Sequence, residues 1–389
     1  MLFSFHKNEW LGNEKNDLFA GLVSSIAILP EVIGFAIIAG VNPISALFAS
    51  AITLLVITFT GGRPAMVSAA AGSMALVIAS LIESHGLHYM IAATILTGFI
   101  QLFLGYMGIH KLMRFIPQTV MFGFVNALAI LIFLAQIQQL PNQSIWSYIM
   151  IVTTIILMYM IPKITKVVPP ALLIILFMTI ISFIFKDNLQ TVGNLGDMSA
   201  ISPTISLPAV PLTLQTLLII LPTSLALAMI GLIESLLTVP IIDKMTDSQS
   251  DSQREVKAQG LGNIITGFFG GQAGCAMIGQ AVINVKSGGR KKLSTLIASI
   301  SLLLFIFVFK DIMIQIPTAA LIGIMITVAL DTFEWESLQL IRTFEITESF
   351  IMIVTISVIV YTHNLAIGII LGVLLSGIVY YFSKKKHSI

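Results

Sequence analysis

The chain consists mainly of apolar runs about as long as a bilayer is thick. Apolar residues make up 57% and charged residues 10% of its 389 positions, and the mean hydropathy is +1.00. A membrane-spanning helix needs roughly 20 predominantly apolar residues, and runs near that length follow one another without room for a soluble domain of ordinary size. They are too long and too continuously apolar for barrel strands. The sequence therefore predicts an all-α integral membrane protein.

Fourteen transmembrane segments are predicted, each bounded by Gly, Pro, Asn or charged residues. They occupy a transmembrane region of about 18–383, between a cytoplasmic N-terminal segment 1–17 and a short cytoplasmic tail 384–389. The segments run approximately over residues 18–38, 43–60, 66–82, 89–109, 117–139, 145–161, 170–185, 213–238, 257–270, 276–287, 293–309, 316–330, 347–362 and 365–382.

The distribution of basic residues supports this count. If the N-terminus is cytoplasmic and the segments alternate, only Lys186 and Lys310 of the 20 Lys and Arg residues fall on the outer side. Cytoplasmic loops of membrane proteins carry an excess of Lys and Arg. Both termini are therefore predicted to be cytoplasmic, in a multi-pass protein of the cell membrane. The basic residues are spread over many short loops, so no nucleic-acid partner is predicted.

Segments three and ten are unusual and occupy matching places. One follows GGRPAMV and begins SAAAGSM, and the other follows FFGGQAG and begins CAMIGQ. Each of the two segments is short, and each is the third in its set of seven. Because seven is an odd number, the second set must cross the membrane in the opposite direction to the first. This pattern predicts a 7+7 inverted repeat with two broken half-helices that meet at mid-membrane. Helix N-termini attract anions or polar carbonyls; alternatively, the small residues only allow close helix packing.

Two acidic residues, Glu31 and Glu234, lie well inside apolar segments. Glu31 follows Pro30, and Glu234 shares a helix face with Thr238 at i+4. Acids inside a membrane are costly and commonly functional, so these positions are predicted to bind a proton or a sodium ion. The alternative is a neutral glutamic acid that hydrogen-bonds between helices without titrating.

Other reactive residue types indicate no further chemistry. The six histidines lie at segment ends or in tails without metal-ligand spacing, and the single cysteine, Cys275, allows no intramolecular disulfide. No nucleophile is paired with a base inside the membrane. We therefore expect no metal, no cofactor and no enzymatic activity.

Several stretches together resemble the sulfate permease (SulP) family. They are NDLFAGLVSSIAILPEVIGFAIIAGVNP, GLIESLLTVPIIDKMTD, QREVKAQGLGNI and GGQAGCAMIGQAVINVKSGGRKKLS. The resemblance implies a core domain (segments 1–4 and 8–11, about 18–110 and 213–309) that carries solute past a gate domain (segments 5–7 and 12–14, about 114–186 and 316–383). It also implies an elevator-type transporter, usually a homodimer, of small anions such as sulfate, bicarbonate, chloride or dicarboxylates.

The family likeness also implies a set of site residues. The coupling ion would use Glu234 and Thr238, and a proton would use Glu31. The anion would lie between the heads of segments three and ten, against Phe35 of the first segment. The implied solute-binding residues are Phe35, Ala71, Gly72, Ser73, Ala276, Met277, Ile278, Gly279 and Gln280.

Three departures from the family pattern affect the expected mechanism. Gln280 stands where many relatives carry Arg, so a fixed positive charge is missing. Ala276, Met277 and Ile278 replace the frequent Thr or Ser, which disfavours sodium. The chain stops at YYFSKKKHSI, without the cytoplasmic STAS domain of most members. The first two departures favour proton symport, with the anion compensated by two helix dipoles and a protonated acid, and the third implies that the chain is not regulated through a STAS domain.

Other functions fit the same pattern. A nucleobase or other neutral-solute proton symporter would use Glu31 and Glu234 to hydrogen-bond a ring. A sodium-coupled anion symporter and an anion channel or exchanger also stay open. The expected partners are a small anion, membrane lipid and a second copy of the chain, and the sequence does not name the anion.

Overall fold

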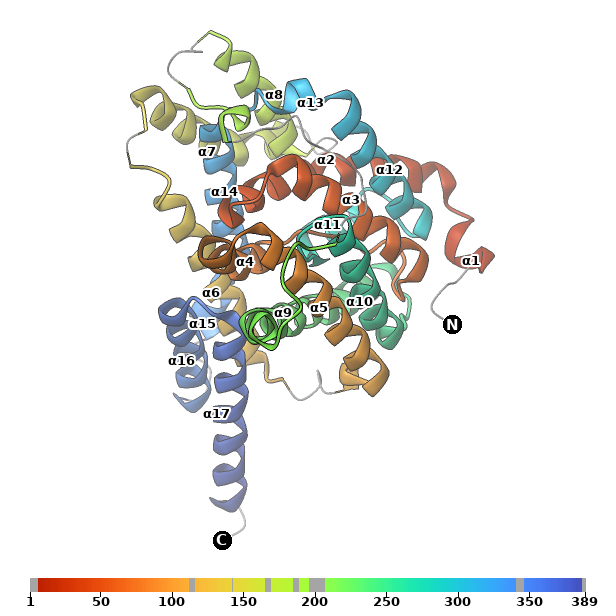
Figure 1. Cartoon of the computed structure of the whole chain (residues 1–389), viewed down its shortest axis with the longest axis vertical. Coiled ribbons are helices and arrows are strands. Elements are labelled where there is room, and N and C mark those ends of the chain that lie inside the picture. The colour runs from red at the N-terminus through yellow and green to blue at the C-terminus, as the bar shows by residue number, and fades with distance from the viewer. Residues whose placement is uncertain are drawn as a thin grey trace.

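A computed structural model describes residues 6–111, 116–141, 143–164, 169–184, 189–195, 207–340 and 346–386. These residues are mostly helical (Figure 1). The first half contains α1 (Lys7–Trp10), α2 (Glu14–Ala39), α3 (Pro43–Thr60), β1 (Ser68–Ala69), α4 (Gly72–His85), α5 (Leu87–Met107), α6 (Gln118–Ile137), α7 (Ile145–Ile164), α8 (Pro170–Ser182) and the 3-10 helix η3 (Val192–Leu195). The second half contains α9 (Leu214–Thr246), α10 (Ser252–Phe268), β2 (Cys275–Ala276), α11 (Ile278–Lys286), α12 (Lys292–Val308), α13 (Lys310–Met313), α14 (Thr318–Thr332), α15 (Trp335–Leu340), α16 (Ile346–Thr362) and α17 (Leu365–Lys386).

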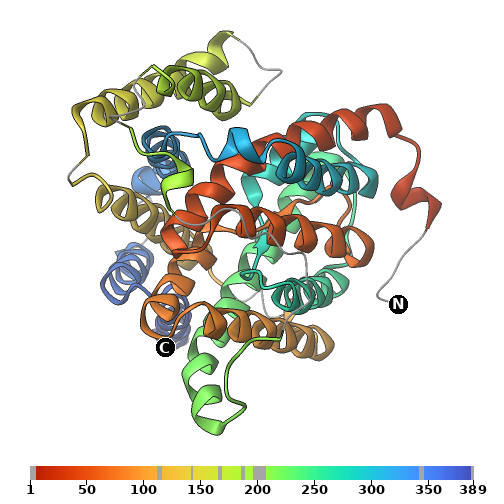
Figure 2. The ribbon, with the colours of Figure 1, turned by 45° about the horizontal axis from the view of Figure 1, so that its top comes forward.

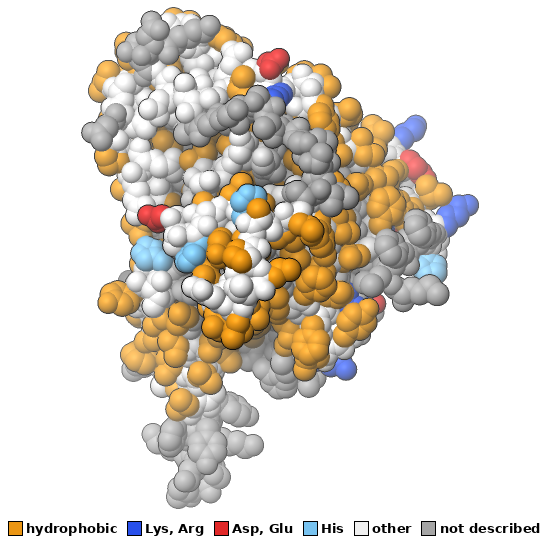
Figure 3. Space-filling view, in the orientation of Figure 1, with side chains coloured by type: hydrophobic (Ala, Val, Ile, Leu, Met, Phe, Trp, Pro, Cys, Tyr) orange, Lys and Arg blue, Asp and Glu red, His pale blue; other side chains and the backbone are white. Residues whose placement is uncertain are grey.

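The helices have the length and surface of a membrane protein. Six of the described helices, α2, α3, α5, α6, α7 and α9, are long and apolar enough to cross a bilayer, and six more apolar helices are shorter. Large apolar side chains such as Phe103, Ile156 and Leu304 are exposed, and Figure 3 shows hydrophobic side chains over much of one face. A soluble monomer rarely exposes so much contiguous apolar surface.

The helix boundaries follow the predicted segments with two main differences. α9 continues to Thr246, well beyond the predicted end near residue 238, even though Pro240 lies inside it. In the third and tenth predicted segments, the chain first forms a short strand, β1 or β2, and the helices α4 and α11 begin only at Gly72 and Ile278. Of the two basic residues predicted on the outer side, Lys310 begins α13 and Lys186 lies outside the described residues.

The helices pack into two groups. In the first, α10 packs against α3 and α5, and α12 packs against α2 and α3. In the second, α16 packs against α6 and α17, while α14 packs against α6 and α7. Smaller contacts join the groups, between α2 and α14, α4 and α6, and α9 and α17. Figures 1 and 2 both show α16 and α17 lying apart from α2, α3 and α12.

A very short sheet interrupts the helical architecture and corrects the strictly all-α prediction. β1 and β2 pair antiparallel, with Ser68 opposite Ala276 and Ala69 opposite Cys275. The Met277 N–H also donates to the Val67 carbonyl at 2.9 Å. The two Gly-rich breaks cannot pair their backbone groups within a helix, so they pair with each other away from water. This pairing brings the first residues of α4 and α11 close together.

Candidate functional site

Side chains from the surrounding helices hold the two strands in place. The Ala70 N–H donates to Ser50 Oγ of α3, and the Ala276 N–H donates to Ser235 Oγ of α9, both at 3.1 Å. The Asn263 amide of α10 bonds both the N–H and the carbonyl of Gly274. Backbone groups in the breaks are therefore satisfied by buried polar side chains, which fix the entry of the chain into α4 and α11.

The first turns of α4 and α11 are not capped by side chains. The N-cap residues are Ala71 and Met277, and neither makes a side-chain capping bond. By contrast, Asn42, Thr213 and Asp251 accept N–H bonds at the starts of α3, α9 and α10. The first N–H groups of a helix have no partner within it, so these two starts are available to a polar or anionic ligand.

Space at the two helix starts is unequal. A Cβ atom on Gly72 would lie 2.6 Å from the Phe35 ring and 3.1 Å from Ile132 Cδ1 of α6, so that side is filled. A Cβ atom on Gly279 would meet no described heavy atom within 4 Å, and Ile278 beside it is exposed. The open side of the candidate site is therefore the start of α11, and Phe35 covers the start of α4.

Glu234 lies directly beside the strand pair. Its Oε2 accepts a hydrogen bond from Cys275 Sγ at 2.7 Å, and Ser73 of α4 lies next to the same carboxyl group. Thr238 is buried one turn away, but its hydroxyl donates to the Glu234 backbone carbonyl at 2.7 Å, a bond that Thr commonly makes within helices. The carboxyl group is therefore held by β2, and α4 lies beside it.

Glu31 lies at the opposite helix start, beside the Gln280 side chain of α11. Gln280 is buried, and its Nε2 makes no hydrogen bond to the described residues. Glu31 of α2 in the first half of the chain thus contacts α11 of the second half, and Glu234 of α9 in the second half contacts α4 of the first half. A buried amide donor is costly to leave unpaired, so we expect Gln280 Nε2 to donate either to the neighbouring Glu31 carboxyl group or to a ligand.

The structure brings most of the expected site residues together around the β1–β2 pair. The sequence patterns gave no sign of two contacts, Cys275 with Glu234 and Gln280 with Glu31. Each joins residues far apart in the chain. The presence of Cys, Ser and Gln among the small apolar residues at the two segment heads was the only available signal.

The sequence patterns also gave no indication of a group of buried ion pairs. Lys292 Nζ lies 3.0 Å from both Glu9 Oε2 and the Gly61 carbonyl, and it is almost fully buried. Arg63 Nε lies 3.2 Å from Asp243 Oδ1. Both residues belong to predicted cytoplasmic loops, and the structure packs their side chains inside the protein, where they hold helix ends together.

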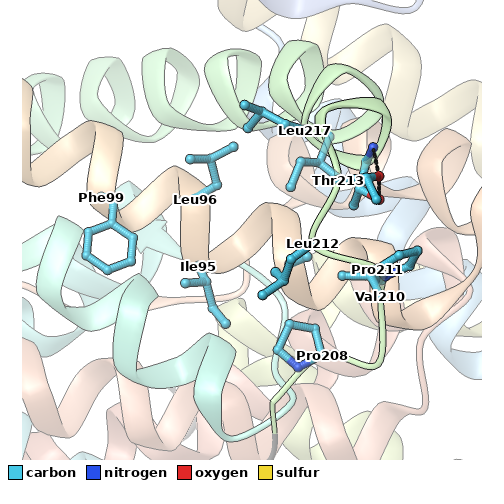
Figure 4. Close-up of a pocket in the computed structure, with 12 residues that line it drawn as sticks. Ile95, Leu96, Phe99, Pro208, Val210, Pro211, Leu212, Thr213 and Leu217 are labelled. Carbon is cyan, nitrogen blue, oxygen red and sulfur yellow. Dashed lines mark hydrogen bonds between the residues drawn. The ribbon is translucent and has the colours of Figure 1, made fainter.

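A separate cavity of about 320 Å³ lies elsewhere, between α5 and the segment that leads into α9. Figure 4 shows its lining side chains, which include Leu96, Phe99, Leu212 and Leu217. None of the expected site residues lines it, and its apolar walls suit no anion. Groups of three or more His, Cys, Asp or Glu that could hold a metal ion are absent from the described residues.

Comparisons with known proteins agree on one family. The family model described as "Sulfate permease family" matches residues 15–145 and 138–355. The chain is 49% identical over 383 residues to "Putative sulfate transporter YbaR" of Bacillus subtilis (strain 168), covering 98% of this chain and 80% of that protein. It is 27% identical over 360 residues to "Bicarbonate transporter BicA" of Picosynechococcus sp., covering 84% of this chain and 63% of that protein.

A solved structure supports the same assignment. The transmembrane domain of a cyanobacterium bicarbonate transporter BicA superposes with a TM-score of 0.82 at 26% identity, covering 96% of this chain and all of that domain. These relatives are named as transporters, not enzymes. The family model covers well over half of the chain, and the fold matches over nearly its whole length. The chain therefore belongs to the sulfate permease family.

Proposed function

We propose that this protein is a secondary active transporter of a small anion of the sulfate, bicarbonate or dicarboxylate class. The observation that carries the proposal is the meeting of two uncapped helix starts at the β1–β2 pair, with the buried Glu234 beside one and the half-buried Glu31 beside the other. Free N–H groups and helix dipoles favour negative charge. The named relatives, a sulfate and a bicarbonate transporter, support the anion class.

Proton symport follows from the charges around this site. Gln280 contributes a neutral amide, so no fixed cation from the site residues compensates the anion. An ionised Glu31 or Glu234 would repel the anion in a medium of low dielectric constant, whereas a protonated carboxyl group would not. The anion therefore binds the protonated form, and proton and anion cross together.

The proposed transport cycle is an elevator-type movement of one helix group past the other. The core comprises α2–α5 and α9–α12, and the gate comprises α6–α8 and α14–α17. The extensive contacts within each group and the smaller contacts between them support this division. An inverted repeat of fourteen membrane segments, cytoplasmic termini and a homodimer belong to the same proposal.

The test is uptake of radiolabelled sulfate and bicarbonate into proteoliposomes under an imposed inward proton gradient. The wild type should accumulate at least one of the two anions. Glu234→Gln should lower gradient-driven accumulation by about 10-fold or more, because a neutral amide cannot carry the proton. Glu83→Gln, an exposed position at the end of α4, is the matched control. Intact gradient-driven uptake in Glu234→Gln would overturn the coupling assignment.

Three further arms separate the alternative functions. A sodium gradient in place of the proton gradient tests sodium coupling. Competition by uracil against the labelled anion tests a nucleobase symporter. Flux that saturates and shows counterflow excludes a channel. We expect little response to sodium, no competition by uracil, and clear counterflow.

A further inference from the structure

The Ser73 hydroxyl is a buried polar group without a hydrogen-bond partner. Its residue is fully buried, and Ser73 Oγ makes no hydrogen bond to any described residue. It nevertheless lies next to both the Glu234 carboxyl and the Cys275 thiol. Ser73 is also the second residue of α4, directly after Gly72 at the uncapped helix start. It therefore lies between the coupling acid and the proposed anion position.

The surroundings of Glu234 restrict which groups exchange hydrogen bonds with it. Cys275 faces it from β2 and Ser73 from α4. Helices α5 and α10 contribute the amides Gln101 and Asn263, which are bonded to each other at 2.8 Å. By sequence, α11 has no ionisable residue before its final Lys286, and α17 has none between residues 365 and 379. Among the described residues, no cation faces the carboxyl group.

A hydroxyl group has one hydrogen to donate and two lone pairs to accept with. When Glu234 is ionised, it is an acceptor only, so it takes the hydrogens of both Cys275 and Ser73. When Glu234 is protonated, its own O–H donates to Ser73 Oγ. The Ser73 hydrogen is then free to turn toward the start of α4. The Ser73 hydroxyl can therefore donate its hydrogen to the acid or to the anion, but not to both at once.

We propose that Ser73 is a hydroxyl relay that presents a hydrogen-bond donor to the anion only when Glu234 is protonated, while the Cys275 thiol holds the carboxyl group in place. This inference rests on the proposed function, since it explains how protonation of one acid is linked to anion binding at the neighbouring helix. The only covalent change is the O–H bond that forms when the Glu234 carboxylate takes up a proton and breaks when it releases the proton; at Ser73 only hydrogen-bond directions change. Cys275 and Ser73 are positioning residues for Glu234, and Ser73 is also a ligand of the anion.

The first test needs no anion. Cys275 is the only cysteine of the chain, so its S–H stretching band, in a region of the infrared spectrum free of other protein bands, reports on the Glu234 carboxyl group. In purified wild type, the band should change once as the pH is varied, and it should stay constant in Glu234→Gln. In Ser73→Ala, the midpoint should move to higher pH, because a hydrogen bond to a charged carboxylate is stronger than one to a neutral carboxyl group. An unmoved midpoint would overturn the relay.

The second test measures equilibrium binding of radiolabelled sulfate and bicarbonate to purified protein at low and high pH. Wild type should bind about 10-fold more tightly at low pH, the effect of gaining one good hydrogen bond. Ser73→Ala should bind more weakly than wild type at low pH and should keep only the part of the pH dependence that comes from repulsion by the ionised acids, and Ser73→Thr should restore the full pH dependence. A full pH dependence in Ser73→Ala would refute the inference. If wild type binds neither anion, the proposed substrate class fails, and the infrared midpoint still decides for or against the relay.

Discussion

At the residue scale, the two glycines at the helix starts should respond differently to the same change. Gly72→Ala places a methyl group against the Phe35 ring, and overpacking of this kind typically costs about 1–3 kcal/mol. Gly279→Ala meets open space and should leave the fold intact. Its methyl group nevertheless enters the place where the anion is expected, and a displacement of about 1 Å is costly to a bound ligand. We expect a lower melting temperature for Gly72→Ala and an unchanged one for Gly279→Ala.

The variants Gly72→Ala and Gly279→Ala also distinguish an effect on helix packing from an effect on anion binding. Gly279→Ala should raise the KM for anion uptake by about 10-fold with normal thermal stability, measured by uptake and by thermal unfolding in detergent. Gly377→Ala, at a position on α17 with no neighbour within 4 Å, is the control that should change neither quantity. Equal loss of stability in both helix-start variants would contradict the difference in space around them.

At the scale of elements, the short helix α1 is predicted to stabilise the start of α12 through one carboxylate. Glu9 lies within 3.0 Å of buried Lys292 and 3.2 Å of Arg254. Removing one partner of a buried ion pair leaves the other charge buried without a counter-charge, in surroundings of low dielectric constant. Glu9→Gln should therefore lower the free energy of unfolding by about 1–3 kcal/mol, as measured by thermal or denaturant unfolding. The exposed Glu83→Gln is the control.

A double variant checks that the loss comes from the pair. Replacing Lys292 with Met in the Glu9→Gln background removes the unpaired charge, so part of the stability should return. Salt at high concentration should change the wild-type stability little, because buried pairs are poorly screened. A double variant whose loss of stability equals the sum of the two single losses would mean that the two residues act independently.

At the scale of the whole molecule, the proposed movement requires α2 to pass α14, and the two helices are tightly packed at Gly34. A Cβ atom on Gly34 would clash with the buried Met325 side chain, whose Cγ would lie 2.6 Å away. Gly34→Val should therefore slow anion uptake by about 10-fold, since packed interfaces resist even one added methyl group. Adding Met325→Ala should restore much of the rate. Initial uptake rates in proteoliposomes measure both effects, and a normal rate for Gly34→Val would argue against passage at this contact.

Much of this architecture could be predicted from local sequence properties. Hydropathy marked the helices, and the Gly-rich breaks marked the two short half-helices, because helix formation and helix interruption depend on neighbouring residues. The positions of Glu31 and Glu234 within apolar runs identified them as candidate coupling acids for the same reason. Boundaries were less accurate where tertiary packing extends a helix, as at α9.

The contacts that define the candidate site could not be predicted from local sequence patterns. Hydropathy and motif spacing by themselves determined the membrane class, the helical segments and the candidate acids. Only the tertiary structure decided that Cys275 and Ser73 face Glu234, that Gln280 faces Glu31, and that Lys292 is buried against Glu9. The physical reason is that hydrophobicity and helix propensity act over a few residues along the chain. Hydrogen bonds and ion pairs act through space, between residues that only the packing of helices from both halves brings together.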